Sequence, residues 1–269
     1  MTSALILSLL IKAVSAAAVV VTATYIAERA GPFWGAIIAC LPISAGPAYV
    51  MLAMEQPADF ISQSALLSFA TNAAMALFIA VMAVLASRIR GWFALFAATA
   101  VWAAGAFAIH AVEWTVALAM IVNLATFALS YAIARRWLKS SNAVAAGKPR
   151  WSDLALRAAL VGALSAGVVG GSEALGPAAT GILAVFPVVF TSMGIILLPR
   201  IGAAATATMM VMALPPLGGF TFGLLVVHLG TAAYGSAWGL TLGLITTLVW
   251  SLGIVLTRRP WSRGSAKPV

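Results

Sequence analysis

Long apolar stretches alternate with short polar ones along the whole chain. Each apolar stretch has about 18 residues or more, enough for a helix to cross a bilayer. The strict alternation of apolar and polar residues that a membrane β-barrel needs is absent. The pattern therefore predicts an all-α integral membrane protein with about nine transmembrane helices, at residues 4–27, 31–54, 60–86, 92–111, 114–134, 154–172, 176–198, 202–229 and 234–256.

The charged residues sort to two sides of this predicted bundle. When the crossings are counted, fourteen of the fifteen Lys and Arg residues fall on one side. Lys and Arg accumulate in cytoplasmic loops because their translocation is unfavourable. The sorting predicts that the N-terminus lies outside and the C-terminus in the cytoplasm. The acidic residues on the outer side are then Glu55, Asp59, Glu113 and Glu173.

A spaced motif occurs twice in the chain. A glutamate, a Gly-Pro pair and a second proline stand at positions 28, 31–32 and 42, and again at positions 173, 176–177 and 187. All three points keep an offset of 145 residues, which indicates an internal duplication. Five crossings separate equivalent points, so the two copies face opposite ways in the membrane, as in many secondary transporters.

The duplication predicts the organisation of the chain. Two inverted four-helix repeats flank a spacer helix, and a polar cytoplasmic loop follows the spacer. The predicted boundaries are 1–112 for the first repeat, 113–138 for the spacer transmembrane helix, 139–153 for the loop, 154–257 for the second repeat and 258–269 for a cytoplasmic tail.

Composition excludes most other classes of protein. The chain is 63% hydrophobic and 8% charged, with a mean hydropathy of +1.08, outside the range of soluble domains. Its net charge of +9 is explained by orientation in the membrane, and basic residues interleaved with aromatics, which nucleic-acid binding needs, are absent. Hydrolase, metalloprotease and nucleotide-binding motifs are also absent, so we expect no enzyme, no metal and no cofactor.

The second proline of each repeat is a candidate for substrate binding. Pro42 and Pro187 come about eleven residues after the Gly-Pro starts, which places them near the middle of the membrane. A proline there frees a backbone carbonyl that can face a substrate or ion. Gly46 and Pro47 reinforce the first position. The alternative is a plain kink that neighbouring helices repair.

Four charged residues are further candidates. Lys12 is a substrate-binding candidate because apolar sequence flanks it, although a lysine can also snorkel to the interface. Glu28 and Glu173 are gate or proton-coupling candidates, and the alternative is a capping role at the positive end of a helix dipole. Arg157 keeps the 145 offset from Lys12 and joins the gate candidates, although we expect it at the cytoplasmic surface.

The repeated core resembles a known family. The segments GAIIACLPISAGPAYVM (35–51) and GILAVFPVVFTSMGIIL (181–197) are similar to the Gly-apolar-Pro core of the GlpM family of small bacterial membrane proteins. The chain then resembles a fused, inverted duplicate of such a unit. The resemblance implies a protein of the bacterial inner membrane with a role in the envelope or with small polar solutes, and it supplies no catalytic residues.

These observations predict a secondary transporter that moves a small solute or metabolite by alternating access. The alternative is a non-transporting membrane component of envelope polysaccharide or lipid-carrier metabolism, as the GlpM resemblance implies. The expected partners are the lipid bilayer, an unidentified small solute and possible further copies of the chain in a homo-oligomer; nucleic acid is not expected.

Overall fold

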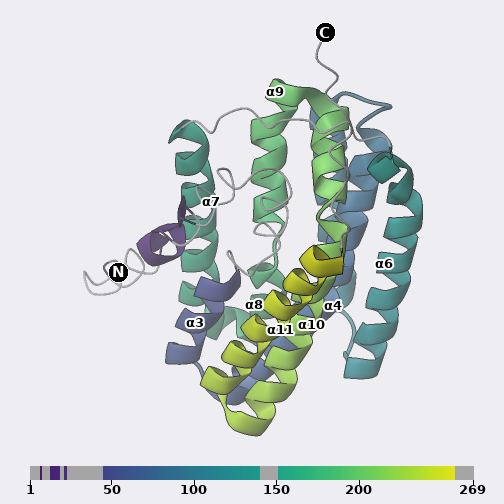
Figure 1. The fold of residues 1–269 in the computed structure, drawn as a ribbon. Coiled ribbons are helices and arrows are strands. Elements are labelled where there is room, and N and C mark those ends of the chain that lie inside the picture. Colours follow the sequence, from purple (N-terminus) through teal and green to yellow (C-terminus); the bar gives the residue numbers. More distant parts are fainter. Residues whose placement is uncertain (1–6, 8–12, 19–20, 23–44, 140–150, 258–269) are drawn as a thin grey trace.

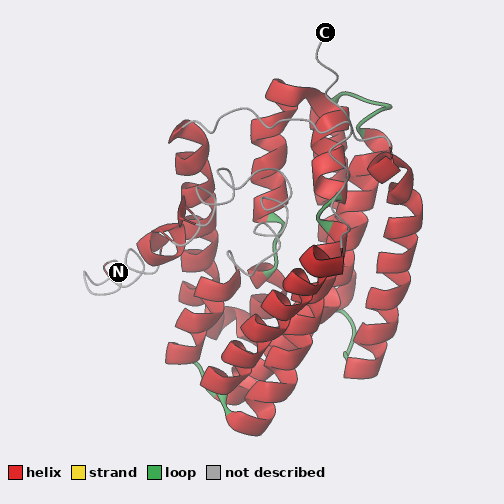
Figure 2. Ribbon diagram, viewed as in Figure 1, coloured by secondary structure: helices red, strands yellow, loops and turns green. Residues whose placement is uncertain are grey.

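The computed structural model describes residues 7, 13–18, 21–22, 45–139 and 151–257. Three of the candidates, Lys12, Glu28 and Pro42, lie outside these residues. The described part of the chain is helical, and short loops join its helices (Figure 2).

Helices α3 to α11 follow one another in an up-and-down bundle (Figure 1). Seven of them are long and apolar enough to cross a membrane, which makes the chain a multi-pass membrane protein. The short ones are α3 and α8. The bounds are α3 Ala45–Glu55, α4 Ala58–Leu85, α5 Gly91–His110, α6 Val116–Lys139, α7 Trp151–Gly170, α8 Ser172–Ala184, α9 Val188–Val211, α10 Leu214–Tyr234 and α11 Ser236–Thr257.

Most predicted helix limits agree with the structure to within a few residues, and one prediction is wrong. Residues 176–198 were expected to form one helix with Pro187 inside it, but α8 ends at Ala184 and α9 begins at Val188. The Gly-Pro start is marked by Gly176, whose φ of 70° interrupts α8 just before Pro177. Gly202, with a φ of 79°, likewise divides α9 at the predicted start of the next helix. Only glycine adopts such angles readily.

The predicted helix 202–229 contains the helix-breaking sequence Pro215-Pro216-Leu217-Gly218-Gly219, but the structure interrupts the chain just before it. The interruption is at Met212 and Ala213, and the two prolines stand in the first turn of α10, where a missing N–H costs little. Gly218 and Gly219 are helical, and their bare backbone accommodates the indole of Trp250 from α11. They are packing positions within a helix.

Helix α4 is the centre of the bundle. It contacts α5, α6, α8, α9 and α10, and 78% of its most apolar 18-residue window is buried, more than in any other candidate span of the described residues. Phe69, Phe78, Ile61 and Met82 are among its fully buried side chains. Other helices are therefore arranged around α4, and their outer faces remain for lipid.

Helices α10 and α11 form a closely packed hairpin (Figure 1). A Cβ atom on Gly223 or Gly243 would meet the facing backbone, and one on Gly239 would meet Thr231. Small residues at such positions let two helix backbones approach, and van der Waals contact replaces the hydrophobic effect that is missing within a membrane.

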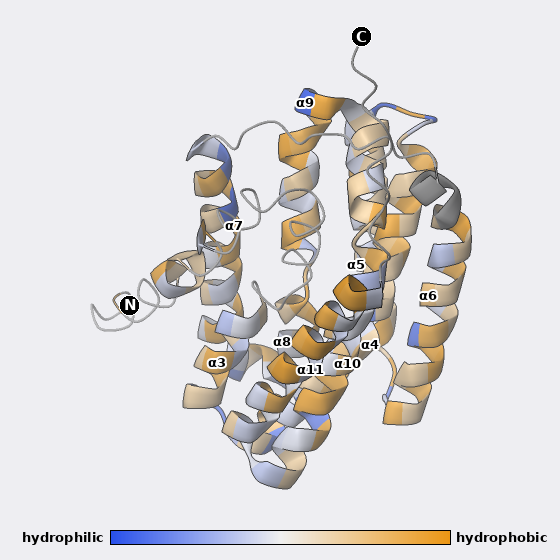
Figure 3. Cartoon of the chain, in the orientation of Figure 1, coloured by the Kyte–Doolittle hydropathy of each residue, from blue (hydrophilic) through white to orange (hydrophobic). Residues whose placement is uncertain are grey.

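Polar contacts between helices define two ends of the bundle. At one end Arg200 of α9 forms a bidentate ion pair with Asp153 at the start of α7, with distances of 2.6 and 2.5 Å. At the other end Gln56 donates to the hydroxyl of Ser172 over 3.1 Å, where the end of α3 meets the start of α8. Between these ends the helices are mainly apolar, and hydrophilic residues gather near helix ends, as at the top of α7 and α9 (Figure 3).

Candidate functional site

The site begins at the interruption between α8 and α9. Proline has no N–H, so Pro187 cannot continue the hydrogen bonding of α8. The chain leaves the helix at Val185, and Pro187 becomes the N-terminal cap of α9. The carbonyl of Pro187 then accepts from both the N–H and the hydroxyl of Thr191, at 2.8 and 2.6 Å. The interruption is thus a defined change of direction within a discontinuous helix.

Side chains from three helices surround this interruption. Trp102 of α5 meets Phe186 edge-on, with ring centroids 5.1 Å apart at 84°. Phe78 of α4 lies 6.3 Å from Phe190, also between centroids. On the α7 side, Val161 belongs to the same apolar cluster as Val188. The interruption therefore lies deep in the bundle.

A chain of hydrogen bonds joins α3, α4 and α8 beside it. Ser68 of α4 lies 2.5 Å from the carbonyl oxygen of Gly181 and 2.7 Å from the hydroxyl of Tyr49. A carbonyl only accepts, so Ser68 donates to Gly181 and Tyr49 donates to Ser68. One turn away, Ser64 donates to the carbonyl of Pro177 over 3.0 Å. Both serines thus hold the first half of the discontinuous helix against α4.

A cavity of about 490 Å³ lies between α3 and the α10–α11 hairpin. Gly46, Pro47 and Tyr49 line it from α3, and Ser15 lines it from the N-terminal part of the chain. Among the described residues that line it there is no Asp, Glu, Lys, Arg or His, and the polar side chains are Ser15, Tyr49 and Thr247. Its volume is within the usual range for small-molecule sites. The described part of the lining suits a small, uncharged molecule with a large apolar part.

The structure brings only some of the candidate residues together. Gly46 and Pro47 line the cavity, whereas Pro187 stands at the helix interruption and is not among the lining residues. Glu173 is exposed in the first turn of α8, where a carboxylate suits the helix dipole. Arg157 is half-buried one turn after Asp153, at the opposite end of the bundle.

The sequence analysis did not identify the two serines on the polar face of α4. Ser64, Ser68 and Asn72 follow one another at intervals of four residues, so they share one face of the helix, and all three are buried. A row of small polar residues at this spacing inside an apolar helix is the signal that could have identified them.

Comparison of the chain with protein-family models, with curated proteins and with solved structures finds no match. The resemblance to the GlpM family stays a prediction, and the site is interpreted from its own residues.

The bridging position of Ser68 leads to a test of the hydrogen-bond chain. Ser68→Ala leaves two buried groups, the Tyr49 hydroxyl and the Gly181 carbonyl, without their partner, whereas Tyr49→Phe removes one bond and leaves Ser68 bonded to Gly181. We expect Ser68→Ala to lower the free energy of unfolding by about 2 kcal/mol and Tyr49→Phe by about 1 kcal/mol. Unfolding by denaturing detergent in mixed micelles measures both. Equal effects would contradict the bridging role.

Proposed function

We propose that this protein is a secondary transporter of the bacterial inner membrane that moves a small, uncharged solute by alternating access. The observation that carries the proposal is the discontinuous α8–α9 helix, interrupted at Val185–Pro187 in the interior of the bundle. Transporters use such interruptions to present backbone groups to a substrate near the middle of the membrane.

Helix boundaries support two repeats at the predicted offset. Helix α5 begins at Gly91 and α11 at Ser236, 145 positions later. Helix α3 ends at Glu55, and the position 145 residues later is Arg200, just before the Gly202 interruption of α9. The α4 start at Ala58 corresponds in the same way to position 203, just after that interruption. In this alignment α6 would be the spacer between the two repeats.

The packing of α4 on α10 supports an inverted relation between these repeats. Ser62 near the start of α4 bonds to His228 near the end of α10, and Asn72 further along α4 donates to Thr221 earlier in α10. The two helices therefore cross antiparallel. Equivalent helices of inverted repeats cross in this way around a pseudo-two-fold axis in the membrane plane.

The ends of the bundle support the proposed orientation. Arg200 pairs with Asp153, and a Cβ on Gly91, next to Arg90, would meet Leu198 of α9, so these basic residues share one end. Ser62 and His228, and Gln56 and Ser172, meet at the other end, near Glu55 and Glu173. The basic end would face the cytoplasm.

Alternating access is tested by the reactivity of a cysteine in the cavity. Val50 lines the cavity from α3, and Cys40 is the one native cysteine, so Val50→Cys is made in a Cys40→Ser background. In vesicles of either orientation, a membrane-impermeant maleimide should label Val50→Cys from both sides, about tenfold faster than Ala48→Cys, because Ala48 is buried. Labelling of Val50→Cys from neither side would favour the non-transporting alternative.

A flux measurement tests whether Pro42, Pro187 and Lys12 contribute to transport. Proteoliposomes are loaded with a panel of radiolabelled uncharged solutes, and efflux is compared with that from protein-free vesicles. Combined replacement of Pro42, Pro187 and Lys12 by alanine should reduce any protein-dependent efflux about tenfold or more, because it removes the candidate substrate-binding residues of both repeats and restores a backbone N–H at position 187. Efflux unchanged by the triple replacement would place the solute site elsewhere in the protein.

A further inference from the structure

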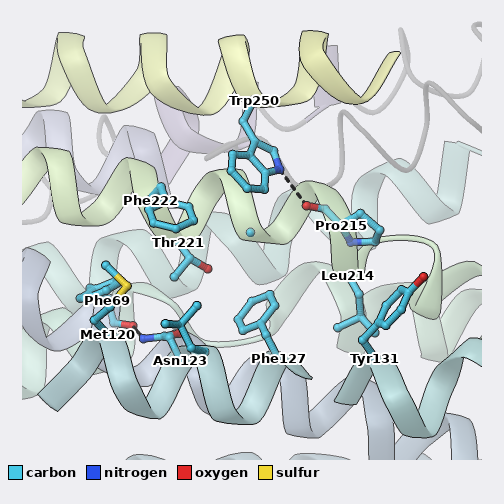
Figure 4. A pocket seen from close by; sticks show the side chains of 12 residues that line it. Phe69, Met120, Asn123, Phe127, Tyr131, Leu214, Pro215, Thr221, Phe222 and Trp250 are labelled. Atoms are coloured by element: carbon cyan, nitrogen blue, oxygen red, sulfur yellow. Dashed lines mark hydrogen bonds between the residues drawn. The ribbon is translucent and has the colours of Figure 1, made fainter. Parts of the chain in front are cut away.

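A second hollow lies on the opposite face of α10 from α3, where the spacer helix α6 stands beside the hairpin (Figure 4). This groove has a volume of about 340 Å³. Its walls are Phe127 from α6, Phe222 from α10 and Trp250 from α11, and Phe69 of α4 closes its inner side. The groove is separate from the cavity at Gly46 and Pro47, and the proposed transport does not use it.

The hydrogen-bond donors of most polar lining residues are already used within the protein. The indole N–H of Trp250 donates to the carbonyl of Pro215 over 2.9 Å, which Figure 4 marks with a dashed line. The amide N–H groups of Asn123 donate to the carbonyls of Phe69 and Ala119, at 2.8 and 2.9 Å. The hydroxyl of Thr221 donates to Leu217 over 2.9 Å. The side-chain oxygen of Asn123 has no partner among the described residues, but it is fully buried. Apart from the Tyr131 hydroxyl, the lining therefore offers a polar ligand little to replace its bonds to water, and the groove favours hydrocarbon.

The groove opens onto the lipid-facing surface. On α6, Ile121, Leu124 and Leu129 are 64%, 59% and 53% exposed, and on α11 Val249 and Leu252 are 63% and 54% exposed. Both helices are candidate membrane spans with few buried residues. Exposed apolar rows of this size at membrane depth face acyl chains. Because the groove lies between two such rows, its occupant comes from the bilayer.

The walls of the groove are preformed. Phe222 and Trp250 lie with ring centroids 5.3 Å apart, and the Trp250 ring rests on Gly218 and Gly219, where no side chain competes for the space. Asn123 holds α6 against α4 on the other side. When a flexible chain binds in such a preformed groove, only the chain itself loses conformational entropy.

We propose that the groove between α6 and the α10–α11 hairpin binds one acyl chain of a membrane phospholipid. The ring of Tyr131 lies near one end of the groove, in the last turns of α6 (Figure 4). Tyr131 is half exposed, so its hydroxyl is placed to meet the ester region of the same lipid. The lipid then belongs to the leaflet at the basic end of the bundle.

The test uses a matched pair of substitutions on α6. Leu124→Phe fills the groove, because Leu124 lines it, whereas Ile121→Phe makes a similar change at a similarly exposed position outside the lining. The protein is reconstituted in vesicles with a phosphatidylcholine that carries a diazirine midway along one acyl chain. After illumination, crosslinked residues are mapped by peptide mass spectrometry.

In the wild type, crosslinks should concentrate on lining residues such as Met120, Phe127 and Trp250. Leu124→Phe should lower crosslinking at these residues about tenfold, and Ile121→Phe should leave it unchanged. Equal thermal stability of the two variants excludes loss of folding as the cause. Crosslinks spread evenly over the exposed residues of α6 and α11 would overturn the proposal. Crosslinks between two copies of the chain through the lining residues would also overturn it, in favour of a dimer interface.

Discussion

Replacing Gly181 by alanine is expected to lower the free energy of unfolding by about 3 kcal/mol, the upper end of the usual cost of overpacking. A Cβ at this position would collide with the backbone carbonyl of Ser64 in α4. A backbone atom of the central helix cannot turn aside as a side chain can, so α4 and α8 must separate. Their separation would lengthen the bonds from Ser68 to Gly181 and from Ser64 to Pro177. Unfolding by denaturing detergent in mixed micelles measures the loss.

The control is Gly167→Ala. Gly167 is also a helical glycine, in α7, but a Cβ there would meet nothing within 4 Å. Alanine at this position should be neutral or stabilise the fold by about 0.5 kcal/mol, because glycine loses more backbone entropy on folding. If Gly181→Ala and Gly167→Ala had the same effect, the close approach of α4 and α8 would be refuted.

Replacing Arg200 by methionine should cost about 2–3 kcal/mol, because it leaves the carboxylate of Asp153 with a much weaker set of partners. Asp153 is only 9% exposed and pairs with Arg200 through both carboxylate oxygens. The side chain of Arg200 is 23% exposed, so the expected cost lies below that of a fully buried pair. The same detergent unfolding experiment measures it.

A double variant separates the effect of losing the ion pair from the cost of leaving one buried charge without its partner. When Asp153→Leu is added to Arg200→Met, both charges are gone and two apolar side chains take their place. Such replacements recover stability because no carboxylate is left buried. The double variant should therefore be more stable than Arg200→Met alone. A strictly additive loss would indicate that the two residues do not act as a pair.

The limits of most helices could be predicted because short polar or glycine-containing segments separate the long apolar ones. The predicted starts at 176 and 202 fall on glycines with positive φ, and the start at 234 falls next to Gly235, which also has a positive φ. Only glycine adopts that conformation at little cost, so the residue type itself marks the boundary.

The interruption at Pro187 was located but not recognised as a full break. Proline is tolerated within spanning helices when neighbours repair the lost hydrogen bond, so the residue type alone does not separate a kink from two helices. In the structure Phe186 packs against Trp102 of α5, and Val188 lies in one apolar cluster with Val161 of α7. Such tertiary contacts, above all the one with α5, cannot be inferred from the sequence around Pro187.

The cavity beside α3 and the groove beside α6 could not be predicted from the sequence. Each is lined by three or four helices, and its shape depends on interhelical distances that hydropathy does not encode. Gly46 and Pro47 were substrate-binding candidates because they interrupt a predicted helix. In the structure they line the wall of a cavity. The serines of α4 were overlooked because a single hydroxyl hardly changes the hydropathy of a long apolar run.

The glycine contacts between α10 and α11 have a mechanical consequence. Gly223, Gly239 and Gly243 bring the two backbones so close that neither helix can rotate or slide against the other without collision. Any displacement of α10 against α4 must therefore carry α11 with it, and the lipid-facing row of α11 must move through the surrounding acyl chains. The work of moving those chains then becomes part of the energy of the displacement. Bilayer thickness and lateral pressure should therefore change the energy of this displacement through the lipid-facing side of α11.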